Sequence, residues 1–530
     1  MSVNVSQDFS CYGRKNDLSV FHASSHLTTV LAAITFSICS VSEARSQEAS
    51  GKTEPAVVKA VPQTVTNTVI IRKPTQTAAK AKTAPNHLDA LFNTESLSAF
   101  LNKDEDSIRE SDLAASYYVP IQTFGSLVPQ LKQPRKWLSD RGFSFQLSYK
   151  SESIANVGGG LSKGMSYTHE ITLTTVFDLG KLIGWDGWKF NAVMLERAGR
   201  QVSYDHVGEH KILLSEIYSL SGNAAAHLAD MYLEKSFYHN KVNINLGRMT
   251  LTHTYSTSAL LCTFMIQCSA PVAVKSNPGW SVYPRATWGG TVRLRPTRDL
   301  SLTTGVYTSG VLQDNPSGWA WGSQSTTGVM VPVELAWEPF FGRDKLVGHY
   351  KLGFGHDTAR YNDLIGTIPA ADQSYVHREK SKPRDTFYIE ADQMVYRSHG
   401  QNQMAGGYLM AGYIHNTPSI STFTDQVYVG TSLLGIIPFR PLDRFGVMYS
   451  YYHLSNRLSY GQRLRQDAGM SMGAFVTGPQ THTATLEAYY SVPVIPGLVL
   501  QPVFEYMMRP GESGKIPNAT LVGIKVMATL

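Results

Sequence analysis

The sequence predicts an all-β fold: a single transmembrane antiparallel β-barrel of about 16 strands, preceded by a disordered N-terminal extension. Three observations support this prediction. Apolar and polar residues alternate through most of the chain beyond Trp137, and the N-terminus resembles an export signal. No apolar run reaches the roughly 18 to 20 residues of a spanning helix, whereas barrel strands bond to one another and leave no backbone group unsatisfied in lipid.

The clearest alternation lies in residues 481–530. They form three runs of about ten residues each, separated by Pro and Gly turns. In the last run, the even-numbered positions are apolar: Val522, Ile524, Val526, Ala528 and Leu530. The odd-numbered positions between them include Gly523 and Lys525. Because successive side chains of a strand point to opposite faces, this strand offers one face to lipid and one to a lumen.

Four segments are expected along the chain: a signal peptide at 1–46, a disordered tether at 47–86, a periplasmic leader at 87–136 and the barrel domain at 137–530. In the first segment, Arg14 and Lys15 precede an apolar run from Leu27 to Val41, and small residues around Ala44 offer a cleavage site. A short buried helix is the alternative for that run.

The tether is rich in Ala, Thr, Lys, Pro and Gln, and such a composition cannot bury enough apolar surface to fold. The leader shows weak helical spacing at Leu88, Leu91, Leu97 and Leu101. A periplasmic helix, a barrel plug and a partly ordered leader all remain open for it.

Strict period-two alternation predicts strands around residues 145–149, 171–177, 231–237, 242–246, 292–295, 331–337 and 387–390. Six more candidates lie near 187–197, 300–309, 347–358, 402–415, 427–438 and 443–455. With the three C-terminal runs the count is about 16, and a barrel of 16 to 18 strands leaves an aqueous channel. A soluble sandwich or propeller is the alternative, but no blade-length repeat is present.

The connections alternate in length, which is typical of such barrels. Tight turns are expected at Asn240–Lys241, Thr297–Asp299 and Ile495–Gly497. Long loops are expected at His253–Pro284, Asp314–Val329, Asp357–Pro383 and Arg457–Gln480. Short turns face the periplasm in this class of protein and long loops face the exterior.

Composition and motifs exclude several classes of function. The net charge of +6 comes without a dense basic stripe, so nucleic acid is not an expected partner. Glu487 and Glu505 can pair across adjacent strands as glycosidase carboxylates do, but such pairs arise easily by chance on lumen-facing strands. No nucleophile, zinc or phosphate-loop motif accompanies them. We therefore expect no enzyme, no cofactor and no metal.

Four cysteines are present, and Cys11 and Cys39 leave with the predicted signal peptide. Cys262 and Cys268 are six residues apart in a loop of an exported chain, which predicts a disulfide that pins an inward-folding loop. A metal site is the alternative, but it requires further thiolates or clustered histidines, and His253 alone does not supply them.

Five segments, in order along about Trp137 to Leu530, carry a resemblance to a known family. They are Ala155–Gly160; Leu228–Phe237 with Asn245–Met249; Cys262–Cys268 with Tyr283–Gly289; Leu434–Asp443 with Phe445–Gly446; and Leu500–Tyr506 with Arg509–Gly511. Together they resemble the carbohydrate-selective porin family of the OprB type. The chain departs from that family in its long tether before Asn86 and in ending at Leu530, where the family usually ends in Phe.

The resemblance implies a channel of the bacterial outer membrane that passes monosaccharides such as glucose by passive diffusion. The implied partners are monosaccharides, outer-membrane lipid and the barrel-assembly machinery. A homotrimer is one assembly left open. A general or anion-selective diffusion porin is the nearest alternative, and a barrel enzyme or an adhesin is the alternative from another class.

Parity predicts which side chains face the lumen: Asp230, Tyr232, Glu234, Arg293, Arg295, Glu334, Tyr388, Glu390, Asp392, Glu487, Gln501 and Glu505. We expect the constriction at Arg293, Arg295 and Glu234, with Asp230 and Tyr232 close by. Mixed charges suit sugar hydroxyls, which accept and donate paired hydrogen bonds. Trp288 and Trp280 are either stacking platforms for sugars or members of an interfacial belt.

Overall fold

The computed structural model describes residues 129–217, 224–258, 260–310, 317–319, 326–365, 367–369, 375–377, 382–398 and 405–530. The predicted signal peptide, the tether and most of the leader lie outside these residues and stay predictions. The described part of the leader is helical: α5 spans Pro129–Asp140, so it crosses the boundary expected at residue 137. The first barrel strand begins at Phe143.

Within the described segments the main sheet has 17 strands, and without the two-residue β9 (Phe340–Phe341) 16 strands form the wall. They are β1 (Phe143–Gly158), β2 (Gly164–Asp178), β3 (Trp188–Gly199), β4 (Ala224–Phe237), β5 (Val242–Met249), β6 (Thr287–Leu294), β7 (Leu300–Gly310), β8 (Thr326–Trp337), β10 (Leu346–Tyr361), β13 (Lys382–Arg397), β14 (Gly406–Asn416), β15 (Phe423–Leu434), β16 (Arg444–Leu454), β17 (His482–Ile495), β18 (Leu498–Met508) and β19 (Ala519–Thr529).

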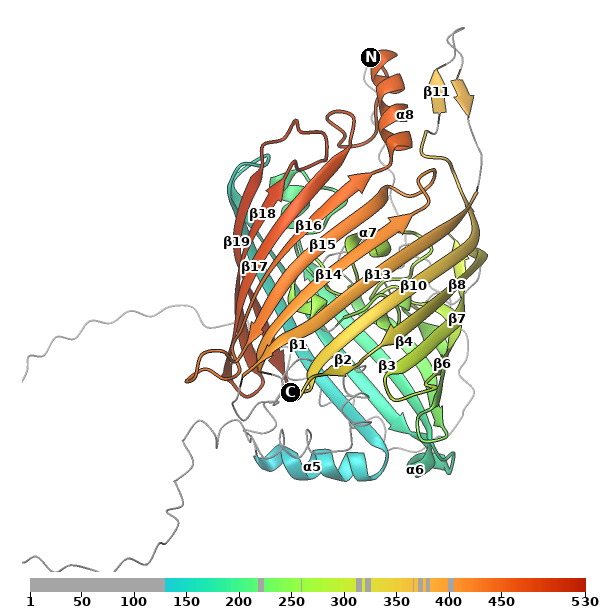
Figure 1. The fold of residues 1–530 in the computed structure, drawn as a ribbon, viewed down its shortest axis with the longest axis vertical. Helices are drawn as coiled ribbons and strands as arrows, with labels where there is room; N and C mark the ends of the chain where they lie inside the picture. The colour runs from blue at the N-terminus through green and yellow to red at the C-terminus, as the bar shows by residue number, and fades with distance from the viewer. Residues whose placement is uncertain are drawn as a thin grey trace, which may run out of the picture. The chain divides into compact units, whose positions relative to one another are not determined.

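Each wall strand pairs antiparallel with its neighbours along the chain, and Figure 1 shows them side by side and tilted. The sheet closes where β1 pairs with β19, for example at Ser151 opposite Val526. The predicted closed barrel and its strand count are confirmed. The strand expected at 427–438 ends earlier than predicted, at Leu434, because Gly435 turns the chain with a φ of 62°.

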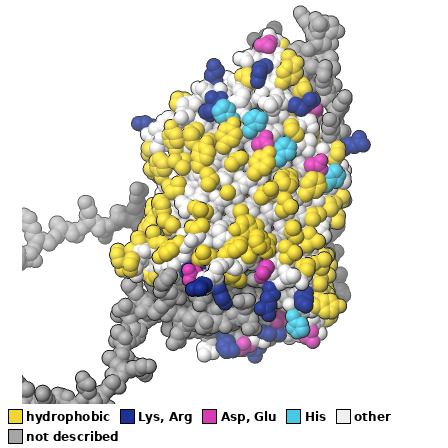
Figure 2. Space-filling model, viewed as in Figure 1, with side chains coloured by type: hydrophobic (Ala, Val, Ile, Leu, Met, Phe, Trp, Pro, Cys, Tyr) yellow, Lys and Arg dark blue, Asp and Glu magenta, His cyan; other side chains and the backbone are white. Residues whose placement is uncertain are grey.

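The alternation of faces is confirmed in β19. Val522 and Ile524 are exposed on the outer surface, whereas Leu521 and Lys525 are buried inside. Figure 2 shows hydrophobic side chains in a broad band over the wall, with charged side chains along both borders. Among the helices of the described segments, none is both long enough and apolar enough to cross a bilayer.

The long connections gather at one end of the barrel, where α8 (Asn456–Asp467) and the hairpin β11 (Thr367–Pro369) and β12 (Tyr375–His377) lie (Figure 1). The opposite end carries short turns, α6 (Leu179–Ile183) and α5. Lys181 of α6 donates a hydrogen bond of 3.0 Å to the carbonyl oxygen of Ser139 in α5. The predicted division into short turns and long loops therefore holds.

The core of the protein lies inside the barrel. Two connections from the long-loop end fold inward: residues 200–217 after β3 and residues 250–286 after β5, which include α7 (Val272–Lys275). Their buried side chains include Val202, Ile212, Leu214, Tyr255, Phe264, Met265, Ile266 and Trp280. A soluble protein buries its apolar side chains between layers of helices and sheets. This protein buries them between the inward-folding loops and the inner face of the barrel.

Two carboxylates join the connection after β3 to the one after β18. Glu209 Oε2 accepts a hydrogen bond of 3.0 Å from the N–H of Gly511. Glu512 Oε2 accepts hydrogen bonds from Lys211 Nζ at 3.0 Å and from Gln480 Nε2 at 2.6 Å. Glu209 and Glu512 are both fully buried. The Lys211 ammonium pairs with Glu512, and the backbone N–H of Lys211 donates to Glu209 Oε1 at 2.7 Å.

Burial and the Glu209 carboxylate raise the pKa of Glu512 from 4.5 to about 8, against the opposing effect of Lys211. The folded protein keeps a proton that the unfolded chain releases, so the free energy of unfolding falls as pH rises from about 4.5 to about 8. We expect Glu512→Gln to flatten this part of the profile of unfolding midpoint against pH, measured by circular dichroism in detergent micelles. The exposed control Asp467→Asn should keep the wild-type slope; the same slope in Glu512→Gln contradicts the assignment.

Candidate functional site

One wall of the lumen holds the 250–286 connection through a single carboxylate on β17. Glu487 Oε1 accepts the N–H of Met265 at 2.6 Å, and Oε2 accepts the N–H of Ile266 at 3.1 Å. On β18, Gln501 Nε2 donates to the carbonyl oxygen of Thr263 at 3.0 Å. Glu505 stands directly opposite Glu487, but Glu487 is committed to the loop backbone. Glu487 is thus a structural residue of the loop, whereas Glu505 makes no hydrogen bond among the described residues.

The opposite wall holds the beginning of the same connection. Glu334 Oε2 accepts the N–H of Ser256 at 2.9 Å, and Glu390 Oε1 accepts the Ser256 hydroxyl at 2.9 Å. Asp392 accepts the hydroxyl of Ser258 at 3.0 Å, and Lys351 Nζ donates to the carbonyl oxygen of Thr257 at 2.6 Å. These acidic residues face inward as parity predicted. They anchor a loop instead of lining open water.

The 200–217 connection is anchored by charge. Its Glu216 carboxylate forms ion pairs with Lys150 of β1 and Lys525 of β19, both on the inner wall. Burial would raise the pKa of Glu216, but the two ammonium groups lower it to about 2. Glu152 of β1 accepts the N–H of Ile217 at 3.2 Å. The two ammonium groups offset the charge of the Glu216 carboxylate, which is why this charge can be buried.

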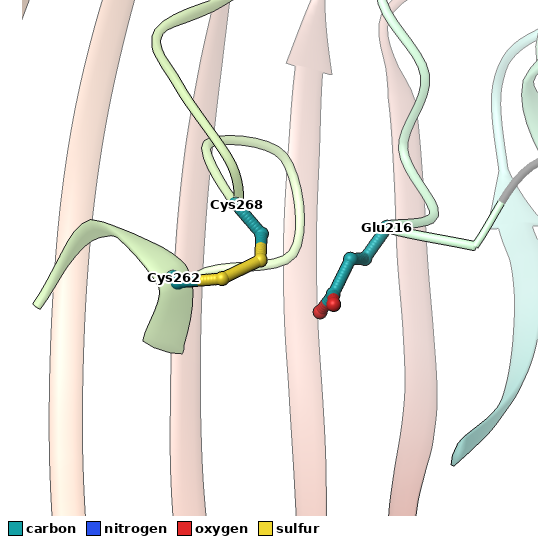
Figure 3. Close-up of side chains that lie close together, drawn as sticks. All are labelled: Glu216, Cys262 and Cys268. Atoms are coloured by element: carbon teal, nitrogen blue, oxygen red, sulfur yellow. A yellow bond between two sulfur atoms is a disulfide. The ribbon is translucent and has the colours of Figure 1, made fainter. Parts of the chain in front are cut away.

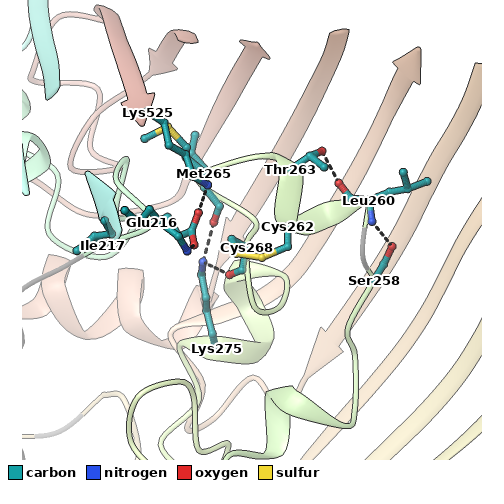
Figure 4. Close-up of a disulfide and its surroundings, with 12 residues drawn as sticks. Glu216, Ile217, Ser258, Leu260, Cys262, Thr263, Met265, Cys268, Lys275 and Lys525 are labelled. Carbon is teal, nitrogen blue, oxygen red and sulfur yellow. Dashed lines mark hydrogen bonds and ion pairs between the residues drawn. A yellow bond between two sulfur atoms is a disulfide. The ribbon is translucent and has the colours of Figure 1, made fainter. Parts of the chain in front are cut away.

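The two inward connections meet at a disulfide between Cys262 and Cys268, as predicted. Figure 3 shows Glu216 beside it, with ligand atoms of the three residues within 4.8 Å of one another. Both sulfur atoms are bonded to each other and Glu216 is held by two lysines, so the trio is not arranged for a metal ion. Lys275 Nζ donates to the carbonyl oxygens of Ile266 at 2.7 Å and Cys268 at 3.3 Å (Figure 4).

A less buried polar surface lies on the inner face of β3 to β7. Glu234 of β4 accepts hydrogen bonds from Asn191 Nδ2 at 3.3 Å and Asn243 Nδ2 at 3.5 Å. Arg293 of β6 donates from Nε to the hydroxyl of Thr303 at 3.2 Å. Glu234 and Arg293 are half-buried, and β5 lies between their strands. The surface thus alternates acceptors, amides and a guanidinium.

Asp230 and Tyr232 continue this surface toward the long-loop end. Asp230 accepts the N–H of Thr250 at 2.8 Å, and His253 Nδ1 lies 3.8 Å from its other oxygen. The ring of Tyr232 meets that of His253 edge-on at 6.2 Å. Asp230 is therefore both a wall residue and the anchor for the first turn of the inward connection.

Three sequence-based expectations need correction. Arg295 lies beyond the end of β6 at the short-turn end, where its Nη1 donates to the carbonyl oxygen of Asn240 at 3.3 Å, so it does not extend the basic ladder to the constriction. Trp288 shares the outward parity of Val292 and is exposed, which fits the belt alternative and contradicts a place in the lumen.

The third correction concerns Trp280, which is neither a stacking platform for sugars nor a member of an interfacial belt. Its side chain is buried in the core inside the barrel, and its Nε1 donates to the hydroxyl of Thr386 at 3.2 Å. Its ring packs edge-on against Tyr255 and Tyr388. No flat face remains for a sugar at this position.

Sequence reasoning missed several residues that organise the lumen. Lys150 and Lys525 already showed inward parity, so the same rule could have added them to the lumen set. Glu216 and His253 lie in connections without periodicity, and no pattern marked them. Their roles become visible only when the loops fold inward.

Comparison with known proteins now decides the family. A sequence model described as "Carbohydrate-selective porin, OprB family" matches residues 162–530. The chain belongs to this family. As a member, it is a carbohydrate-selective channel of the outer membrane, and its long-loop end is extracellular. The OprB family is one of channels rather than enzymes.

Individual relatives span most of this OprB-family chain. Porin B of Pseudomonas aeruginosa is 25% identical over 407 residues, 74% of this chain and 88% of that protein. The putative porin QuiX of Acinetobacter baylyi is 23% identical over 406 residues, 74% of this chain and 90% of that protein. The high-pH structure of Pseudomonas putida OprB, 22% identical, covers 75% of this chain and 96% of its own with a TM-score of 0.68, and it shares the fold.

The loop anchor on β17 can be tested directly. Glu487→Ala removes the acceptors of two buried N–H groups, which costs about 1–3 kcal/mol each. We expect the freed loop to increase open-channel current noise in planar bilayers several-fold. Glu505→Ala is the matched control, since its carboxylate has no hydrogen-bond partner among the described residues. Equal noise in wild type and Glu487→Ala would show that this contact does not restrain the loop.

The titration of His253 gives a second test. The Asp230 carboxylate, 3.8 Å from the ring, raises the pKa of His253 above 6.5, although desolvation and Arg293 oppose it. The added positive charge is present below the raised pKa and lost as pH rises through it. We expect chloride over potassium permeability to increase as pH falls through that range, and His253→Gln to remove this increase. A variant that keeps the full pH response assigns it to another group.

Proposed function

We propose that the chain conducts monosaccharides such as glucose by passive diffusion, with its constriction on the inner face of β3 to β7. The observation that carries this proposal is the combination of the half-buried Glu234 and Arg293 with the amides of Asn191 and Asn243 on one wall. A sugar presents vicinal hydroxyls that both donate and accept, so it pairs with carboxylate, amide and guanidinium groups at once.

Such a surface also suits conduction. Glu234 and Arg293 already bond to neutral neighbours, so a sugar replaces existing hydrogen bonds and gains little net free energy. Weak binding lets the solute leave, which a channel requires. Asp230 and Tyr232 complete the wall at its extracellular side, and the chemistry needs no catalytic group.

A general or anion-selective porin is the second candidate. Arg293 and the protonated form of His253 add positive charge to the same wall, which favours anions. Sugar acids would then pass as readily as neutral sugars.

We also propose that copies of the chain associate, and a homotrimer about the membrane normal is one closed assembly that keeps the barrel axes parallel. The supporting observation is an outward polar pair: His169 Nε2 of β2 lies 3.2 Å from Glu196 Oε2 of β3. Charged groups on a lipid-facing wall are costly, and contact with a second copy removes that cost. Insertion of each copy would depend on the barrel-assembly machinery.

The decisive measurement is single-channel conductance of the folded chain, titrated with glucose and then with a non-sugar solute of similar size. We expect glucose alone to reduce the current, and Arg293→Ala to weaken this block about two- to tenfold, since an exchanged hydrogen bond contributes about 0.5–1.5 kcal/mol. Arg295→Ala is the matched control, because that residue lies beyond the strand end. Block by both solutes favours the general porin, and block that Arg293→Ala leaves unchanged moves the constriction elsewhere.

A further inference from the structure

A row of metal-ligand side chains crosses the outer face of the barrel at its extracellular border. His415 of β14, Asp425 of β15, His453 of β16 and His482 of β17 stand directly opposite one another in the register of adjacent strands. Figure 2 shows histidine side chains at the upper edge of the hydrophobic band. Register-opposed side chains have Cβ atoms about 4.5–5.5 Å apart, so neighbouring rings in this row can reach one common atom.

The row lies where the wall meets water. His453 is followed by Leu454, the last residue of β16, and His482 is the first residue of β17. The side chains of His453 and Asp425 are 33% and 31% exposed. Tyr451 and Ala484 occupy the next outward positions toward the membrane. An aromatic residue beneath the polar row is typical of the interfacial girdle, so the row itself faces solvent.

Contacts with neighbouring residues at Nδ1 fix the orientation of the His453 ring. Thr424 donates its hydroxyl to the carbonyl oxygen of His453 at 3.3 Å, which leaves the Thr424 oxygen to accept from His453 Nδ1 at 3.0 Å. The carboxylate of Asp425 lies 3.6 Å from the same nitrogen. With the proton on Nδ1, Nε2 keeps its lone pair and is able to bind an ion.

His482 repeats this arrangement. The hydroxyl of Thr481 lies 3.1 Å from His482 Nδ1 and donates to the carbonyl oxygen of Glu512 at 3.5 Å. Arg509 donates to the same hydroxyl at 3.3 Å and to the carbonyl oxygen of His482 at 3.3 Å. Among the described residues nothing bonds to Nε2 of either ring. Histidines that ligate metals show this pattern, with one nitrogen hydrogen-bonded to protein oxygen and the other on the ion.

We propose that Nε2 of His453 and Nε2 of His482 bind one divalent transition-metal ion of the Cu²⁺, Ni²⁺ or Zn²⁺ class, with water in the remaining positions. Two imidazoles suit these ions, whereas Ca²⁺ and Mg²⁺ require oxygen ligands. Asp425 supplies negative charge that offsets the nearby guanidinium of Arg509. His415 donates from Nδ1 to the other oxygen of Asp425 at 2.9 Å and so fixes that carboxylate. The site is on the outer wall and is independent of sugar passage.

The test uses the untagged, metal-stripped folded chain in detergent micelles, titrated with Cu²⁺ and followed by calorimetry and electron paramagnetic resonance. We expect one equivalent of Cu²⁺ to bind tightly, and its electron paramagnetic resonance spectrum to show coupling to two imidazole nitrogens. His453→Asn and His482→Asn should each weaken binding at least about tenfold and leave one coupled nitrogen, and Asp425→Asn should weaken it about tenfold. His356→Asn is the matched control, since His356 also faces outward near this border and bonds to Asp385 at 2.7 Å.

Wild-type affinity in both His453→Asn and His482→Asn overturns the proposal, and so does a spectrum without two coupled nitrogens in the wild type. Because the spectrum counts ligands in the unaltered protein, the test does not depend on every variant folding. Equal losses in His356→Asn and His453→Asn would mean scattered surface histidines and would also overturn it.

Discussion

The interior of this porin depends on hydrogen bonds between wall carboxylates and loop backbone. A chain that enters a barrel brings N–H and C=O groups that find little water there, and each unsatisfied group costs free energy. Glu487, Glu334 and the side chain of Gln501 meet that requirement at three places on the wall. Because each contact joins a rigid strand to an irregular segment, the strands determine where the loop lies.

The same constraint explains why the inner wall carries paired charges instead of a ring of one sign. Glu216 lies in the inward-folding connection 200–217. It forms ion pairs with Lys150 of β1 and Lys525 of β19, the two strands that close the barrel. Glu170 of β2 pairs with Arg197 of β3 in the next part of the wall. An uncompensated charge at these depths is costly, so the pairs at Glu216 and Arg197 each place opposite charges together. The groups left accessible, such as Glu234 and Arg293, are the ones available to a solute.

Much of the fold was predictable, because a strand pattern of period two is local. Every predicted strand corresponds to one observed strand, and parity correctly turned Asp230, Glu234, Glu334 and Arg293 inward. Parity gave no information about strand ends, so Arg295 was assigned to a strand that stops at Leu294. Parity also gave no information about the irregular segments between strands. Glu216, His253 and the buried Trp280 owe their positions to tertiary contacts that no sequence period encodes.

The pairing of β1 with β19 has a consequence for the assembly of the protein. All other wall pairs join neighbours along the chain, but this one joins residues nearly four hundred positions apart, such as Ser148 and Thr529. Until the C-terminal strand arrives, both β1 and β18 present unpaired edges, which template aggregation. A chain truncated before Ala519 would keep most of its local pairs and still have two open edges in lipid. The barrel therefore closes only when its last eleven-residue strand pairs with β1.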